Sequence, residues 1–128
     1  MSTPATAPAI SHIGQIAIVV KDVERAVAFY QNVLGLPFLF RAGNLAFLMC
    51  GQTRLMLDVA AEPEFDHPGS ILYFSVPDIN AAYQQMKSRG AEFRDQPHMI
   101  ARMPDHELWM TFFKDTEGNT LALMSEVR

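Results

Sequence analysis

The chain has 128 residues, of which 49% are hydrophobic, and its formal net charge is −4. This length suits one domain with its own core, and the acidic balance offers no basic surface for nucleic acid or an anionic membrane. A single cysteine, Cys50, excludes a disulfide within the chain, and no apolar run reaches the roughly 18 residues of a membrane helix. We therefore expect a cytoplasmic protein that binds neither nucleic acid nor membrane.

The first half of the chain predicts a strand, a helix and three more strands. Residues 1–11 are rich in proline, alanine, serine and threonine, and we expect a flexible arm there, not a secretory signal. A strand follows, and Asp22 is a good N-cap for a helix that Gly35 ends. The helix has an apolar stripe at helical spacing: Val23, Ala26, Val27 and Tyr30. Turn signals at 43–44 and 51–52 then separate three apolar runs.

The second half repeats this pattern. Val76 and Asp78 correspond to Val20 and Asp22, so a strand again leads into a helix that an aspartate caps. That helix ends near Gly90, and strand signals with two turns follow it. Each half therefore reads β-α-β-β-β, which makes an internal repeat of about 55 residues.

The repeat predicts an α+β fold in which two β-α-β-β-β modules share one domain over 12–128. A single module would leave one face of its sheet uncovered, so the two are expected to fold together. Module 1 covers about 12–60 and module 2 about 70–127. A polar, proline-bearing linker at about 61–69 separates them.

Alternation along the predicted strands separates an aliphatic face from a mixed face. The aliphatic positions, expected to pack on the helices, are Ile16, Ile18, Val20, Leu55, Leu57, Val59, Leu72, Phe74, Val76, Leu121 and Leu123. The mixed face is too apolar to be bare to water, so we expect it to line a concave cleft.

The sequence resembles the vicinal oxygen chelate superfamily in two stretches, QIAIVVKDVERAVAFYQNVLGL and FFKDTEGNTLALM. Members of that superfamily include glyoxalase I, bleomycin-resistance proteins, extradiol dioxygenases and methylmalonyl-CoA epimerase. The resemblance extends over about residues 12–126. It implies an incompletely closed barrel around a cleft, a homodimer and, in the enzymes, one divalent metal held by four side chains.

The four metal-binding positions of that superfamily correspond here to Gln15, Met56, Ile71 and Ala122. Gln15 offers an amide oxygen, whereas Met56 is a soft thioether and the other two have no donor atom. A shift of two residues in the fourth strand would bring Asp58 to the site, but two ligands would still be missing, and a catalytic metal needs about three from the protein. We therefore predict that the standard metal site is lost and that no cofactor is bound.

Our preferred interpretation is a metal-independent protein that binds a small, partly apolar or aromatic molecule in the cleft. The residues expected to contact this ligand are Gln15, Arg54, Met56, Asp58, Tyr73, Trp109 and Ala122. A guanidinium on an apolar face needs an acidic partner or an anionic ligand, so a simple salt bridge between Arg54 and Asp58 remains open. Ordinary core packing also remains open for the aromatic residues.

A glyoxalase- or dioxygenase-type enzyme (a lyase, isomerase or oxidoreductase) with a divalent metal at a displaced site is the alternative. His98, His106 and Glu107 lie on one predicted hairpin and would supply metal ligands and an acid-base group. A metal-free enzyme with His106 or Glu107 as base is a third possibility. Histidines at a turn or rim also fit the pattern, and we expect Cys50 to be a small buried hydrophobe.

Overall fold

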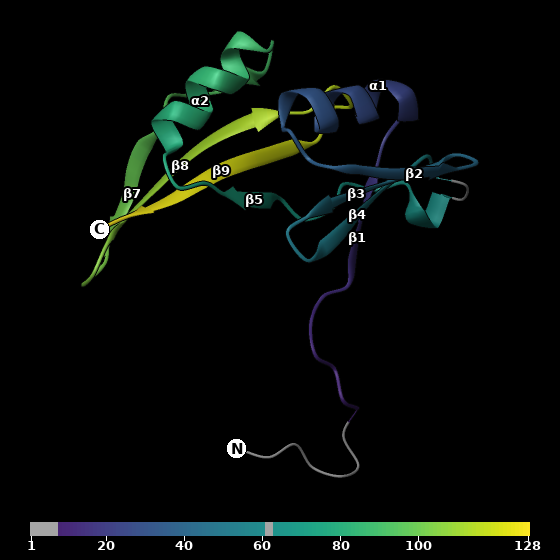
Figure 1. Cartoon of the computed structure of the whole chain (residues 1–128), viewed down its shortest axis with the longest axis horizontal. Coiled ribbons are helices and arrows are strands. Elements are labelled where there is room, and N and C mark those ends of the chain that lie inside the picture. The colour runs from purple at the N-terminus through teal and green to yellow at the C-terminus, as the bar shows by residue number, and fades with distance from the viewer. Residues whose placement is uncertain (1–7, 61–62) are drawn as a thin grey trace.

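The computed structural model describes residues 8–60 and 63–128, which form two sheets that each carry a helix on one face (Figure 1). The first module contains β1 (Gln15–Val19), α1 (Val23–Ala28), the π-helix η1 (Phe29–Val33), β2 (Phe38–Ala42), β3 (Leu45–Cys50) and β4 (Thr53–Asp58). The 3₁₀-helix η2 (Pro63–Phe65) follows. The second module contains β5 (Leu72–Ser75), α2 (Ile79–Ser88), β6 (Glu92–Phe93), β7 (His98–Arg102), β8 (Glu107–Lys114) and β9 (Thr120–Val127).

Both sheets have the same strand arrangement. The first has the order β1-β4-β3-β2 and the second β5-β9-β8-β6, with β7 also paired to β8. In each sheet the first and last strands of the module are parallel neighbours, and the other pairs are antiparallel. The predicted α+β fold of two β-α-β-β-β modules, open between its sheets, is therefore confirmed.

The arm predicted over 1–11 falls mainly on residues 1–7, which lie outside the described residues. Residues 61–62 of the predicted linker also lie outside them. Residues 8–14 lead into β1 without a helix or strand. Among the helices of the described residues, none combines the length and the apolar character that crossing a membrane requires.

The predicted aspartate caps are present at both helices. Oδ1 of Asp22 accepts from the backbone N–H of Arg25, and Oδ1 of Asp78 accepts from that of Ala81, each at 3.1 Å. These bonds supply partners for N–H groups that the first turn of a helix leaves open. Asp22 and Asp78 therefore mark the start of each helix, as the sequence predicted.

The first helix departs from the predicted regular α-helix after Ala28. The N–H of Leu34 donates to the carbonyl of Phe29 at 3.2 Å, which is the wider spacing of a π-helix. The two aromatic residues at this point, Phe29 and Tyr30, are 6% and 0% exposed. Both rings therefore face the core at the point where the helix widens.

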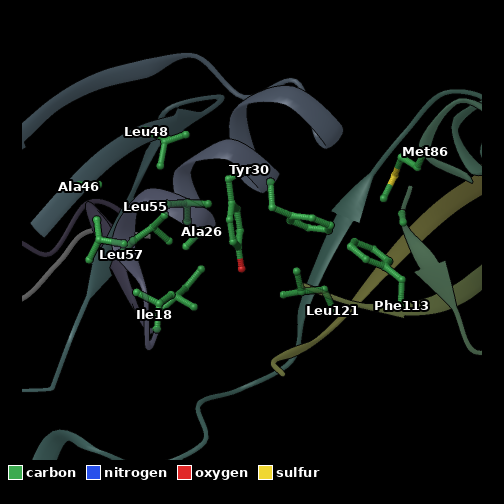
Figure 2. Close-up of a cluster of buried hydrophobic side chains, with 14 of the residues drawn as sticks. Ile18, Ala26, Tyr30, Ala46, Leu48, Leu55, Leu57, Met86, Phe113 and Leu121 are labelled. Carbon is green, nitrogen blue, oxygen red and sulfur yellow. The ribbon is translucent and has the colours of Figure 1, made fainter. Parts of the chain in front are cut away.

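The aliphatic faces predicted from alternation form one shared core. Figure 2 shows Tyr30 between Leu55 and Ile18 of the first sheet and Leu121 and Phe113 of the second. The other aliphatic positions predicted for these faces are also buried or packed against this cluster. The core therefore crosses from one module to the other, as expected for two modules that fold together.

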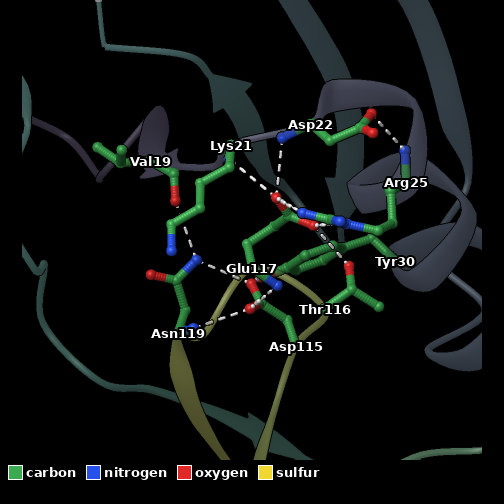
Figure 3. Close-up of polar contacts among 9 residues, drawn as sticks. All are labelled: Val19, Lys21, Asp22, Arg25, Tyr30, Asp115, Thr116, Glu117 and Asn119. Carbon is green, nitrogen blue, oxygen red and sulfur yellow. Dashed lines mark hydrogen bonds and ion pairs between the residues drawn. The ribbon is translucent and has the colours of Figure 1, made fainter.

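A buried carboxylate also connects the modules, from the turn between β8 and β9 to the start of α1 (Figure 3). The side chain of Glu117 is 0% exposed and accepts from the backbone N–H groups of Lys21 at 2.8 Å and Asp22 at 2.9 Å. Nε of Arg25 donates to Glu117 Oε2 at 2.7 Å. These donors, Arg25 first, outweigh the effect of burial and lower the pKa of Glu117 to about 2.

Asp115, in the same turn, accepts from the hydroxyl of Tyr30 at 2.8 Å (Figure 3). It also accepts from the backbone and the side chain of Asn119, whose amide donates in turn to the carbonyl of Val19 at 3.0 Å. Burial and the neighbouring Asp115 raise the pKa of Tyr30 well above its usual range. We call the turn of residues 115–119 the connecting turn.

Candidate functional site

The face of the first sheet that points away from α1 brings polar and aromatic side chains together. Cross-strand pairing aligns Gln15 with Arg54, Met56 with Phe47, and Phe47 with Phe40. Side chains of paired residues lie on the same side of a sheet. We call this surface, made by these five residues, the first open face.

Arg54 is positioned by two contacts on the first open face. Its Nε donates to Gln15 Oε1 at 2.7 Å, and its guanidinium carbon lies 5.1 Å from the centroid of the Phe47 ring. Phe47 stacks on Phe40 with a centroid distance of 4.6 Å. The result is an exposed cation above a stacked aromatic pair, a geometry in which cation–π attraction adds to the hydrogen bond.

The salt bridge between Arg54 and Asp58 that the sequence left open is absent from the described residues. Asp58 is paired with Val19, whereas Arg54 is paired with Gln15 at the other end of β4. Four residue steps along a strand separate the two charged side chains by about 13 Å. The partner of Arg54 is thus the amide of Gln15, and its charge is not neutralised by Asp58.

The corresponding face of the second sheet is aromatic. Ala122 is paired with Tyr73 on one side and Phe112 on the other, and the two rings meet edge to face with centroids 5.9 Å apart. Ala122 is consequently 0% exposed although no helix covers this face, while Tyr73 remains 43% exposed. We call Tyr73, Phe112 and Ala122 the second open face.

Of the four residues that the resemblance predicts at metal positions, Gln15 and Met56 belong to the first open face and Ala122 to the second. Met56 lies next to Gln15, with its Sδ 3.5 Å from Gln15 Nε2. Ile71 precedes β5 and is 44% exposed, and Ala122 is buried under the aromatic rings. Within residues 8–60 and 63–128, no three histidine, cysteine, aspartate or glutamate side chains are placed to hold a metal ion.

The predicted hairpin does not bring His98 and His106 together. β7 and β8 pair His98 with Met110 and Arg102 with Glu107, so the two histidines lie at opposite ends of the hairpin. His98 Nδ1 donates to the carbonyl of Gln96 at 2.8 Å, and the side chain is exposed. Four residue steps from His98 to the end of β7 correspond to about 13 Å, too far for a shared metal ion.

His106 belongs to a separate, charged cavity at the tip of this hairpin. Its Nδ1 lies 2.7 Å from Asp105 Oδ1 and its Nε2 lies 3.9 Å from Glu126, while its side chain is 14% exposed. The hydrogen bond from His106 lowers the pKa of Asp105. The cavity has a volume of about 390 Å³ and is lined by Arg102, Met103, Pro104, Asp105, His106, Glu107, Val127 and Arg128.

Glu107 and Trp109 face the helix side of the second sheet, away from Tyr73. Glu107 Oε2 meets Arg102 Nη2 at 2.8 Å, and Glu107 Oε1 accepts from Trp109 Nε1 at 3.1 Å. Trp109 and Phe112 are an odd number of positions apart on β8, so their side chains point to opposite sides of the sheet. Phe112 lies on the open side, and Trp109 packs against the shared core. The structure therefore places Trp109 apart from the other predicted ligand-binding residues.

The comparisons with known proteins agree with this architecture. A crystal structure of a member of the Glyoxalase/bleomycin resistance protein/dioxygenase superfamily from Sphaerobacter thermophilus is 28% identical, with 91% of this chain and 98% of that chain covered and a TM-score of 0.77. TnmS3, an antibiotic binding protein from Streptomyces sp. CB03234, is 26% identical, with 94% and 99% covered and a TM-score of 0.74.

A lactoylglutathione lyase from Agrobacterium tumefaciens shares the fold at 20% identity, with 92% of this chain and 96% of that chain covered and a TM-score of 0.67. The family model that matches the chain is described as Glyoxalase/Bleomycin resistance protein/Dioxygenase superfamily, and it matches residues 12–123. The open two-module fold and this match over most of the sequence agree. The chain belongs to the Glyoxalase/Bleomycin resistance protein/Dioxygenase superfamily.

Proposed function

We propose that the protein is a metal-independent binding protein for a small, planar, partly aromatic molecule that carries an anionic or carbonyl oxygen. The observation that carries this proposal is the first open face, where Gln15 holds the Arg54 guanidinium over Phe47. Phe40, which is 47% exposed and stacks on the buried Phe47, offers a flat apolar surface for an aromatic ring. The remaining N–H groups of Arg54 are suited to an oxygen at the edge of that ring.

The donor atoms at the superfamily metal positions do not fit a divalent ion. The amide oxygen of Gln15 already accepts from Arg54, and the positive guanidinium beside it opposes a second cation. Met56 is a thioether, which suits softer metals than those of an oxygen-rich site. Ile71 and Ala122 have no donor, so we propose that a ligand, and not a metal, occupies this region.

One of the similar proteins supports a binding role. TnmS3 is described as an antibiotic binding protein, and it resembles this chain over nearly the whole length of both. A fold that binds a small molecule without chemistry needs an apolar surface and a few polar groups that orient the ligand. The first open face of this chain provides both.

We further propose that the protein works as a cytoplasmic homodimer in which a second copy faces the open sheet surfaces. Large apolar side chains are exposed there and on the neighbouring hairpin: Leu39, Phe40, Ile71, Tyr73, Met99, Ile100 and Met103. A sheet face of this kind is normally covered by another layer. A second copy would both cover these side chains and enclose the ligand.

The test combines metal analysis with ligand binding on the full chain. The protein would be exposed to Zn²⁺, Mn²⁺, Ni²⁺ or Fe²⁺, desalted and analysed for metal, and then titrated with planar aromatic carboxylates such as salicylate and naphthoate. We expect no stoichiometric metal and saturable binding that the Arg54→Met variant weakens by about tenfold, the value of one charge-assisted contact. One tightly bound ion per chain would contradict the metal-independent role.

The matched control for Arg54→Met is Arg41→Met. Arg41 is also an exposed arginine of the first sheet, but its side chain donates to the carbonyls of Gly43 and Leu45 within its own hairpin. Loss of Arg41 should leave binding unchanged. Equal effects of the two variants would point to nonspecific attraction between the ligand and positive charge.

An enzyme remains the second candidate, because His106 is largely buried beside a cavity of about 390 Å³. In that case Asp105 would orient the imidazole as an acid-base group. A lyase or isomerase activity that the His106→Ala variant abolishes, and that Arg54→Met leaves intact, would favour this candidate over the binding protein.

A further inference from the structure

A second cavity lies on the helix side of the sheets, between the two modules. Its volume is about 280 Å³, and its walls come from η1 and β3 of the first module and from β5, α2 and β9 of the second. Apolar side chains dominate the lining, among them Leu36, Phe74 and Ala82. A cavity with walls from both modules is a suitable place for a small molecule to bridge them.

This cavity is distinct from both open faces. Phe74 and Leu123 line the cavity and pack against the shared core, whereas Tyr73 and Ala122 lie on the second open face. Successive residues of a strand point to opposite sides of a sheet. A ligand in this cavity would therefore be separated by the sheet from a ligand on the open faces.

The polar groups of the cavity have one sign of charge. Arg89 is the only charged residue among those that line it, and aspartate and glutamate are absent from the lining within the described part of the chain. Gln85 lies four residues before Arg89, so the two are neighbours on one side of α2. Among the side chains that the structure describes, which are those of residues 8–60, 63 and 65–128, none forms a hydrogen bond or ion pair with the side chain of Arg89, which is exposed and available to a ligand.

We propose that this cavity is a second binding site for a small amphipathic monocarboxylate. The apolar chain of the ligand lies between the modules, and its carboxylate meets Arg89 and Gln85 at the rim. With about 30 Å³ for each water-sized group, the cavity holds about nine such groups. A saturated acid of about eight carbons has this size, and octanoate is the probe of choice.

Cys50 provides a built-in reporter for this site. It is the only cysteine of the chain and it lines the cavity. Burial raises the pKa of the Cys50 thiol, which keeps it protonated and slow to react in the absence of ligand. A molecule in the cavity would cover the thiol and slow its alkylation further.

The experiment measures octanoate binding to the full chain by calorimetry and by the rate of Cys50 alkylation with iodoacetamide. We expect saturable binding with protection of Cys50 by about fivefold or more, and weaker binding of octan-1-ol and octylamine. The Arg89→Gln variant should weaken octanoate binding by about tenfold, as expected for a charge-assisted hydrogen bond. The matched control is Lys87→Gln, which removes a positive charge from α2 at a residue outside the cavity lining.

A cavity-filling variant gives an independent test. The Ala82→Phe side chain should occupy the cavity and abolish octanoate binding in a protein whose circular dichroism is unchanged. Octanoate without effect on Cys50 alkylation would overturn the site, and equal affinity for octanoate and octylamine would overturn its ligand class. Arg54→Met should leave octanoate binding intact, so failure of this site and failure of the proposed function are distinguishable.

Discussion

Arg54 donates to Gln15 across the parallel pair of β1 and β4, so the amide oxygen of Gln15 holds the guanidinium in place. The resemblance predicted Gln15 at a metal-binding position. Here its oxygen meets a guanidinium at 2.7 Å. This place in the fold thus carries a positive charge, which the side chain of Arg54 supplies.

Replacing Gln15 with leucine should weaken the binding of an aromatic carboxylate by about threefold to tenfold. The variant removes the acceptor that orients Arg54, while the guanidinium itself stays on the first open face. Calorimetric titration checks this. Gln84→Leu, at an exposed position of α2, is the control and should have no effect. A Gln15→Leu variant with unchanged affinity would show that Arg54 needs no support.

Replacing Ala122 with glutamate should destabilise the protein by about 3 kcal/mol or more and should not create a metal site. The new carboxylate would be buried between the rings of Tyr73 and Phe112 without a partner. Urea denaturation measures the loss, with Ala122→Ser as a control that costs about 1 kcal/mol. Unchanged stability with glutamate would mean that the aromatic pair opens easily.

The stability of the protein should fall as the pH drops from about 4.5 toward 2, because Glu117 must then be protonated. Its pKa is about 2 in the folded state and 4.5 ordinarily, so its contribution is complete above pH 4.5 and is lost as the pH falls through 2. This difference corresponds to at most about 3 kcal/mol, since Arg25 is half exposed. Glu117→Gln should be less stable at neutral pH and should lack this pH dependence in urea denaturation. A variant that keeps the full acid sensitivity would assign it to other carboxylates.

Replacing Tyr30 with phenylalanine should cost about 1 to 2 kcal/mol, because the buried hydroxyl loses its bond to Asp115. Asp115 keeps its bonds from Asn119, which limits the cost. The control is Tyr83→Phe, whose ring is 8% exposed and stacks under Lys87. Thermal denaturation of both variants compares them. Equal losses would show that the hydroxyl bond to Asp115 contributes nothing specific.

Local spacing was enough to predict the two modules, the aspartate caps and the aliphatic faces. Each of these depends on residues within a few positions of one another, as Asp22 and Arg25 show. The π-helix was not predicted, because the apolar stripe that includes Tyr30 also fits a regular α-helix. The bond between Tyr30 and Asp115 joins residues 85 positions apart, so local spacing does not reveal it. No local signal in the sequence marks Glu117 as buried, although its side chain is 0% exposed.

Local spacing also explains which of the predicted site residues lie close together. Gln15, Arg54 and Met56 do lie together, because alternation along two adjacent strands is readable. The partner of Arg54 depends on the register between strands, which the sequence does not show. Trp109 was misplaced because β8 is apolar on both sides, so its alternation does not reveal which side meets the helices.

The connecting turn has a consequence for how the chain reaches its final state. Glu117 and Asp115 supply partners for the start of α1 and for Tyr30, yet they follow those groups by 85 to 96 residues. During synthesis the first module therefore emerges with its helix start and a core hydroxyl unsatisfied. Such distant contacts delay folding, because the loop between them must be closed first. The first module therefore reaches its final structure only after the hairpin of β8 and β9 has formed. The two modules then become stable together.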